Sequence, residues 1–343
     1  MMKTLLLIAT LIGLSYQTCD PSTCLLPTCR CYNDPKAPGD LGVTEIPQII
    51  SVSFEGTINR ENIAYYRLLF NDVSNPNGCP ARGTFFVQDQ GTDYVQVKNL
   101  SQEGHEIGVH SVDGSTPKSS TEWIDTIKKV RSELDDLIDV KNVLGVRAPQ
   151  LAMGGSDEMI GIGSNNMLYD SSCTNVGYSE PGTFLWPYTF DYIPSATCDN
   201  GKSPDIMFTG KWEVMVADLH DLGSDKLPCA VPSSCRNITT KRNAFDLFFT
   251  AFEEHYTSNR APFNMVIDPA WAADQNKRDG TIEFLQYVRA AFGKDVWIVP
   301  ILKQLEWVRN PTPIVNISSF DPWNCNFAMQ HDAPLLFEAE DVY

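Results

Sequence analysis

The chain has 343 residues, and its 43 Asp and Glu residues outnumber its 26 Lys and Arg residues, which gives a net charge of −17 near neutral pH. So acidic a protein repels nucleic acid and anionic membranes, and both are excluded as partners, whereas a neutral or cationic partner is favoured. All ten cysteines lie beyond the first 17 residues. An even number of cysteines in an exported chain is typical of disulfide bonding.

Residues 1–17 have the features of a secretory signal peptide. Lys3 gives a basic start, and the apolar run from Leu5 to Leu14 is too short to span a bilayer. No later stretch of the sequence is apolar for long enough to cross a membrane. We therefore expect a secreted, extracellular protein, in which three N-x-[ST] sequons are candidate glycosylation sites: Asn99, Asn237 and Asn316.

Residues 18–45 are rich in Cys, Pro and Asp and show no periodicity, which predicts a cysteine-rich N-terminal arm. Because so short a segment has little core of its own, its four cysteines are expected to pair among themselves: Cys19, Cys24, Cys29 and Cys31. A metal cluster is the alternative for these crowded cysteines. No matching CxxC pair or Cys/His spacing supports it.

After the arm, short apolar runs alternate with amphipathic stretches. The strand-like runs are Ile49–Phe54, Thr84–Val87, Glu106–His110, Val143–Val146, Leu168–Asp170, Met265–Asp268 and Val296–Ile301. Between several of them lie helix-like stretches, namely Arg60–Phe70, Trp123–Ile138, Phe245–His255 and Ile282–Phe292. This alternation predicts a parallel α/β fold, although periodicity does not choose between a barrel and an open sheet.

Two stretches lack periodicity. Residues 171–235 contain many Pro, Gly and Cys, which predicts long surface loops tied by disulfides. Four cysteines of this region are expected to pair within their own set, in an order that the sequence leaves open: Cys173, Cys198, Cys229 and Cys235. The tail from Asn310 is irregular.

Eight segments together resemble insect chitin deacetylases, which are polysaccharide deacetylases (NodB-homology carbohydrate esterases). They are SVSFEGTIN from Ser51, NPNGCPARGTFFV from Asn75, GHEIGVHS from Gly104, GVRAP from Gly145, LYDSS from Leu168, LWPYT from Leu185, NRAPF from Asn259 and DPAW from Asp268. The resemblance implies that residues 46–310 form a distorted (β/α) barrel with disulfide-tied loop insertions and a site at the carboxyl ends of its strands. The tail, residues 311–343, is then anchored by Cys325, for which Cys79 is the expected partner.

The family uses a zinc ion, held by one Asp and two His, to hydrolyse N-acetyl groups, so the resemblance implies a hydrolase of carbon–nitrogen bonds other than peptide bonds. A second Asp takes a proton from water, and a late His protonates the departing amine. The matching motifs place the base on Glu55, the first zinc-binding His on His110 and the base-orienting Arg on Arg147. Asp170 matches the carboxylate that supports the late His.

Other family positions carry residues that cannot do the same chemistry. The zinc-binding Asp falls on Gly56 and the second zinc-binding His on Gly114, and neither side chain has a ligand atom. The late His falls on Asp268, which is ionised near neutral pH and has no proton to give. Gln150 stands where the family has an aromatic residue. The sequence therefore predicts no zinc cofactor and lost or negligible deacetylase activity.

Two interpretations of the surviving polar residues stay open. In the first, Glu55 and His110 converge with Asp113 and Asp268 on a rewired metal site, and the protein is an active deacetylase. In the second, the same residues form a polar barrel mouth that is satisfied by Arg147 and water.

Aromatic and histidine side chains are the other candidates. Trp186 and Tyr188 lie in the matched LWPYT segment, and the resemblance makes them candidate residues for stacking on a sugar ring. His105 and His255 have no partner at ligand spacing and are expected to be surface or capping residues.

Taken together, these features predict a secreted chitin deacetylase-like protein that has lost its activity and binds chitin or related N-acetylglucosamine polymers. An extracellular chitinous matrix, such as a gut lining or cuticle, is the expected location, and matrix proteins are further candidate partners. Two alternatives stay open: an active deacetylase with a rewired site, and an interaction protein that binds no sugar.

Overall fold

The computed structural model describes residues 18–174, 184–195 and 198–325. The predicted signal peptide and the tail beyond Cys325 lie outside the described residues. No helix in the described part of the chain is both long and apolar enough to cross a membrane.

The fold is built around strand β1 (Gln48–Gly56), whose first seven residues are buried. It pairs in parallel with three strands, which are β2 (Thr84–Gln88), β12 (Phe263–Ile267) and β13 (Val296–Ile298). A strand that is buried on both faces is typical of a parallel sheet covered by helices. This explains why residues 49–54 read as a strand in the sequence although they do not alternate strictly.

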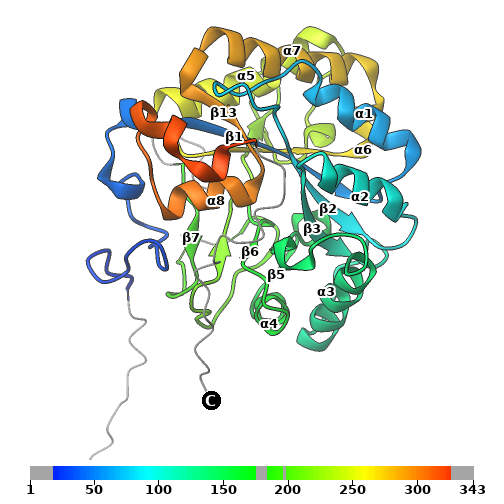
Figure 1. The fold of residues 1–343 in the computed structure, drawn as a ribbon, viewed down its shortest axis with the longest axis vertical. Coiled ribbons are helices and arrows are strands. Elements are labelled where there is room, and N and C mark those ends of the chain that lie inside the picture. The colour runs from blue at the N-terminus through cyan, green and yellow to red at the C-terminus, as the bar shows by residue number, and fades with distance from the viewer. Residues whose placement is uncertain (1–17, 175–183, 196–197, 326–343) are drawn as a thin grey trace, which may run out of the picture.

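The main sheet of the described chain runs in the order β12–β1–β2–β3–β4–β6–β9–β7, with β13 alongside β1. Its other strands are β3 (Glu106–Ser111), β4 (Gly145–Val146), β6 (Tyr169–Asp170), β7 (Tyr188–Thr189) and β9 (Trp212–Glu213). Only β7 runs antiparallel to its neighbour. The sheet curls as it passes from β1 to β7 (Figure 1). This curled half-barrel confirms the expected distorted (β/α) barrel.

The prediction of loops throughout residues 171–235 is wrong in part. Strands β7 and β9 come from this stretch and complete the sheet beyond β6. Two small pairs also involve it, namely β5 (Met153–Gly154) with β8 (Gly201–Lys202), and β10 (Leu219–His220) with β11 (Pro228–Cys229). Each of these strands has two residues, which is too short for a period of two to show in the sequence.

The helices are α1 (Arg60–Phe70), α2 (Tyr94–Gln102), α3 (Ser120–Leu134), α4 (Ser156–Ser164), α5 (Lys241–Thr257), α6 (Pro269–Ala273), α7 (Gln275–Ala291) and α8 (Ile301–Arg309). Side chains accept hydrogen bonds from the first backbone N–H groups of several helices, as Asn59 does for α1 and Ser119 for α3. Helices α1, α5 and α7 cover one side of β1, and α3 packs against α4 (Figure 1).

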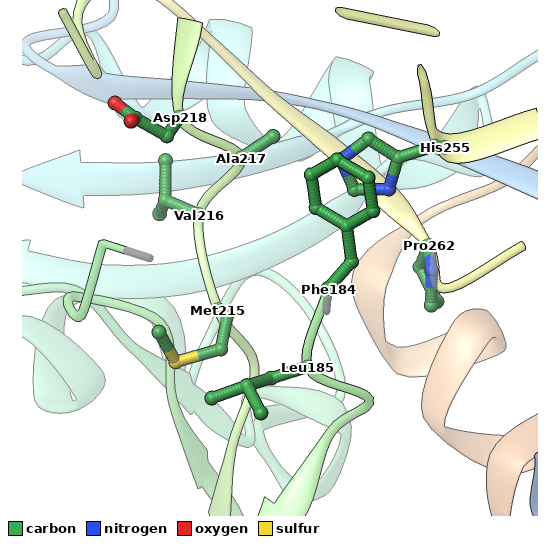
Figure 2. A pocket seen from close by; sticks show the side chains of 8 residues that line it. All are labelled: Phe184, Leu185, Met215, Val216, Ala217, Asp218, His255 and Pro262. Carbon is green, nitrogen blue, oxygen red and sulfur yellow. The ribbon is translucent and has the colours of Figure 1, made fainter. Parts of the chain in front are cut away.

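His105 and His255 are buried, so the expectation that they are surface or capping residues is wrong. The Nδ1 atom of His105 accepts a hydrogen bond from the backbone of Gly83 at 3.0 Å. The ring of His255 stacks on that of Phe184 (Figure 2), and the two ring centroids are 3.9 Å apart. Burial lowers the pKa of His105 to about 3 and that of His255 to about 4. Both rings are therefore neutral packing residues.

Five disulfides join all ten cysteines, and they are Cys19–Cys31, Cys24–Cys29, Cys79–Cys325, Cys173–Cys198 and Cys229–Cys235. The four cysteines of the arm pair among themselves, and the later four pair within their own set, as the sequence predicts. The Cys79–Cys325 bond closes the largest loop, with a sequence separation of 246 residues.

Candidate active-site region at the carboxyl ends of the strands

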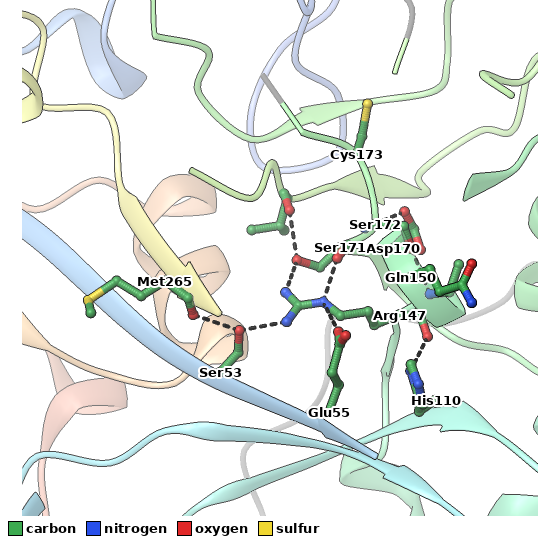
Figure 3. A network of polar contacts seen from close by, with 12 residues as sticks. Ser53, Glu55, His110, Arg147, Gln150, Asp170, Ser171, Ser172, Cys173 and Met265 are labelled. Atoms are coloured by element: carbon green, nitrogen blue, oxygen red, sulfur yellow. Dashed lines mark hydrogen bonds and ion pairs between the residues drawn. The ribbon is translucent and has the colours of Figure 1, made fainter. Parts of the chain in front are cut away.

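The parallel strands bring their carboxyl ends to one edge of the sheet, and the residues predicted for the site lie there. Glu55 is near the end of β1, His110 is in β3, and Arg147 directly follows β4. Asp170 ends β6 and Asp268 directly follows β12. Figure 3 shows Glu55, His110 and Asp170 grouped around Arg147.

The fully buried guanidinium of Arg147 organises this region. Its Nη1 donates to Ser53 Oγ at 2.6 Å, while Nε and Nη2 donate to the carbonyl and hydroxyl oxygens of Ser171 at 2.7 and 2.8 Å (Figure 3). Glu55 Oε2 lies 3.9 Å from Nε, beyond hydrogen-bond distance. The arginine is therefore held mainly by neutral oxygens, and Glu55 interacts with it only through charge.

Glu55 is a carboxyl group in a poorly solvated place. Its side chain is 14% exposed, and its buried Oε2 atom has no hydrogen-bond partner. Burial raises the pKa of Glu55, Arg147 opposes this rise, and the charge of Asp268 adds to it. A raised pKa makes this carboxylate a stronger base than an ordinary exposed glutamate.

His110 is buried beside Arg147 and is neutral. Burial lowers the pKa of its ring to about 4. Its Nδ1 atom lies 3.0 Å from the carbonyl oxygen of Arg147, and because a carbonyl only accepts, Nδ1 carries the proton. The lone pair is consequently on Nε2, which is the tautomer that a metal-binding or proton-accepting histidine needs.

Asp170 belongs to a buried group of three carboxyls, of which the sequence analysis missed two. Its register partner in β9 is Glu213, and Glu158 reaches it from α4. The carboxyl groups of Glu158 and Glu213 lie close enough to Asp170 to affect its pKa, and the Asp170 oxygens accept hydrogen bonds from the backbone and hydroxyl of Ser172. Burial and the nearby Asp170 raise the pKa of Glu158 and Glu213 well above the usual value, which favours their protonated forms. The sequence does contain a sign of this group, because Glu213 is the one charged residue in the apolar run WEVMVA and a charged residue in such a run is expected to be buried with a partner.

Trp186 and Tyr188 do not present a ring to solvent. They are 4% and 2% exposed, respectively. Trp186 stacks on Trp307, and Tyr188 packs edge-on against Phe190. The expectation that these two residues stack on a sugar is therefore corrected, because Trp186 and Tyr188 are each buried in a hydrophobic cluster of the core.

Comparison with known proteins agrees with the resemblance. No family model matches the chain. It is 30% identical to chitin deacetylase 8 of Bombyx mori over 344 residues, an alignment that covers 95% of this chain and 87% of that protein. It is 32% identical to chitin deacetylase 1 of Bombyx mori over 323 residues, covering 89% of this chain but only 59% of that longer protein. The chain belongs to the chitin deacetylase family.

The fold of this chitin deacetylase family member also agrees with a solved structure. A Mycobacterium smegmatis protein assigned to the polysaccharide deacetylases superposes with a TM-score of 0.52 over 81% of this chain and 95% of that one, at 18% identity. At this identity the likeness concerns the fold alone. The chemistry has to be argued from the residues of the site.

The residues of this family member do not fit a zinc ion. Gly56 has a φ angle of +107° and Gly114 one of +87°, and neither side chain offers a ligand atom. Within the described residues, the only three metal-ligating side chains whose ligand atoms gather within 4.8 Å are Cys19, Cys24 and Cys31, and all three are in disulfides. His110 is thus left without the companions that zinc requires.

The rewired set is not assembled either. Asp113 is exposed and accepts hydrogen bonds from the backbone and hydroxyl of Ser115. Asp268 is the N-cap of α6: its Oδ1 accepts from Trp271 N at 2.9 Å and from Ser233 Oγ at 2.7 Å. Both carboxylates are therefore engaged in local structure, whereas Glu55 and His110, the predicted base and first ligand, lie near Arg147.

Proposed function

We propose that this protein is a secreted chitin deacetylase-like protein that does not hydrolyse N-acetyl groups by the metal-dependent route of its family. It retains the scaffold to bind chitin or related N-acetylglucosamine polymers in an extracellular matrix. The five disulfides support an oxidising, extracellular location. Two relatives named as chitin deacetylases and the acidic charge, which suits a neutral or cationic polymer, support the ligand class.

The main support for the loss of metal-dependent activity is that two of the family's three zinc-ligand positions carry glycine. Gly56 and Gly114 have no side chain to bind a metal. Both also have a positive φ angle, a backbone conformation that favours glycine over residues with a Cβ atom. Asp268, at the position of the proton donor, is committed to capping α6. What remains is Glu55 as a carboxyl with a raised pKa, beside the neutral His110, with no group to polarise an acetamide carbonyl in the family's manner.

The test measures binding and catalysis on the same protein. We expect retention on insoluble chitin, no acetate release from chitin oligomers with added zinc, and no change in melting temperature on adding zinc or a chelator. A ligand present at 100 times its Kd stabilises a protein by about 2.7 kcal/mol, so a true zinc site would be visible. His110→Ala is the matched control and should leave zinc response unchanged.

The possible results separate the two halves of the proposal. Acetate release that a chelator abolishes would show an active metal enzyme and would overturn the loss of activity. Failure to retain the folded protein on chitin, in the presence of retained positive-control protein, would overturn the binding role.

A further inference from the structure

An acidic pocket lies beside the Arg147 region, with Gln150 in its wall. It has a volume of about 270 Å³, just below the range of roughly 300–1,000 Å³ that ligand pockets occupy. Its wall combines the turn after Arg147, the chain that follows β6, and the hairpin of β10 and β11. The polar side chains that line it are Gln150, Thr174, Asp199, Asn200, Asp218 and Ser234.

Asp218 is the feature that points to a ligand. Its side chain is 2% exposed, and neither carboxylate oxygen has a hydrogen-bond partner. Its carboxylate points away from the aromatic pair Phe184 and His255, as Figure 2 shows. The nearest basic group, Nε2 of His220, is 4.0 Å from Oδ2. A buried carboxyl group with unused acceptors destabilises the protein unless something pairs with it.

A second carboxylate adds to the negative charge of the pocket. Asp199 lies in the same wall, where its Oδ2 accepts a hydrogen bond from Thr174 Oγ1 at 2.5 Å. Burial raises the pKa of Asp218 to about 7, the charges of Asp199 and Glu254 add to this rise, and the backbone of Leu219 opposes it in part. No Lys or Arg is among the described residues that line the pocket.

The chemistry favours an ammonium group over a metal ion as the missing cation. Calcium takes six to eight oxygen ligands, and no three carboxylate or histidine ligand atoms gather within 4.8 Å among the described residues here. An ammonium group has three N–H donors and is satisfied by a few acceptors, such as two carboxylates and an amide oxygen. The pocket is also larger than an ion needs, which leaves space for a ring that carries the ammonium.

We infer that this pocket binds an amino sugar with a free ammonium group, that is, a glucosamine unit of a partly deacetylated polymer. The inference rests on the proposed function in that it presumes a polymer of amino sugars as ligand. It goes further by assigning a preference for units that have already lost their acetyl group. Asp218 and Asp199 supply the charge, and Asn200 and Gln150 supply neutral partners.

The test compares glucosamine and N-acetylglucosamine oligomers of equal length by calorimetry at pH 7 and moderate salt. We expect the glucosamine oligomer to bind the parent protein at least 10-fold more tightly. Because the pKa of Asp218 is about 7 in the free protein, an ammonium that binds there should displace a proton. The measured enthalpy should then depend on the ionisation enthalpy of the buffer.

Two isosteric variants and one control locate the effect. Asp218→Asn should abolish both the preference and the proton release, and Asp199→Asn should weaken the preference without changing the proton count as strongly. The double variant Asp135→Asn/Asp136→Asn removes two exposed charges elsewhere and should change neither. Thermal melts establish that each variant is folded, and the asparagines keep the size of the original side chains.

The outcomes distinguish this inference from the proposed function. Equal binding of both oligomers, or an unchanged preference in folded Asp218→Asn and Asp199→Asn, overturns the pocket assignment and leaves chitin binding standing. Binding of neither oligomer overturns both. A preference that the Asp135/Asp136 control loses to the same extent would reveal a general charge effect and would also overturn the assignment.

Discussion

At the residue scale, the two glycines at the family's ligand positions show how far the site has departed from a zinc centre. A Cβ atom on Gly56 would meet nothing within 4 Å, so space is not the obstacle there. A Cβ atom on Gly114 would lie 3.0 Å from Oε1 of Gln88, a mobile side-chain end. The obstacle is the positive φ angle at both positions, which costs a residue with a Cβ atom about 1–2 kcal/mol in the left-handed region.

Restoring the ligands tests this interpretation. We expect Gly56→Asp and Gly114→His each to lower the free energy of unfolding of the zinc-free protein by about 1–2 kcal/mol. The double variant should regain stability on adding zinc, because His110 then has two companion ligands, while each single variant should respond little. Melting curves with zinc and with chelator measure both effects. Adding His110→Ala to the double variant should remove the zinc response, and a persisting response would place the metal elsewhere.

At the scale of elements, β6, β9 and α4 meet at three carboxyls that have no cation within hydrogen-bond distance among the described residues. Parallel register sets Asp170 opposite Glu213, and the first turn of α4 adds Glu158. The guanidinium of Arg147 is near but is used by Ser53 and Ser171. The raised pKa values of Glu158 and Glu213 favour their protonated forms, so we expect the packing of these elements to be sensitive to alkali.

The sign of the pH dependence follows from the direction of the shift. The pKa of Glu213 is raised in the folded protein, so its contribution to stability is complete below the unfolded value of about 4.5 and is lost as the pH rises through the folded pKa. Each such proton lowers the free energy of unfolding by about 1.4 kcal/mol per pH unit in that window. Glu213→Gln, which cannot ionise, should remove this part of the loss.

Chemical denaturation from pH 4 to pH 10 measures the effect. The exposed Glu61→Gln variant is the control and should follow the parent protein. If Glu213→Gln and the parent lose stability in parallel as the pH rises, Glu213 does not hold a proton in the folded state and this explanation of the alkali sensitivity is wrong.

At the scale of the whole molecule, the Cys79–Cys325 bond ties the chain after α1 to the C-terminal segment. Nearby, Trp323 packs against Trp297, and its indole N–H donates to the carbonyl of Lys303. In the chain-entropy account, a disulfide stabilises by restricting the unfolded chain, and the effect grows with loop length. The separation of 246 residues makes this bond the largest contributor of that kind.

Removing the bond should therefore have a clear effect. We expect Cys79→Ala/Cys325→Ala to lower the free energy of unfolding by about 2–5 kcal/mol under non-reducing conditions. The Cys24→Ala/Cys29→Ala variant removes a bond with a separation of only 5 residues and should lose less. Denaturant titrations compare the two, and an equal or larger loss in the short-loop variant would contradict the loop-length argument.

The sequence by itself determined the elements that depend on local residue patterns and the site residues that belong to motifs. Apolar runs and amphipathic stretches predicted β1, β2, β3 and α1 close to their observed bounds, and the motifs predicted that Glu55, His110 and Arg147 lie at one edge of the sheet. Such features depend on neighbours along the chain and on the shared direction of parallel strands.

Only the tertiary structure decided which side chains are buried and with what. The sequence predicted that Trp186 stacks on a sugar ring, but its side chain is buried in the core. It also offered Asp268 as a candidate ligand of a rewired metal site, but this residue is the N-cap of α6. The carboxyl cluster and the pocket of Asp218 join segments from distant parts of the chain. Two-residue strands and the packing of loops bring these segments together. Neither produces a hydrophobic periodicity, so the contacts could not be predicted from the sequence.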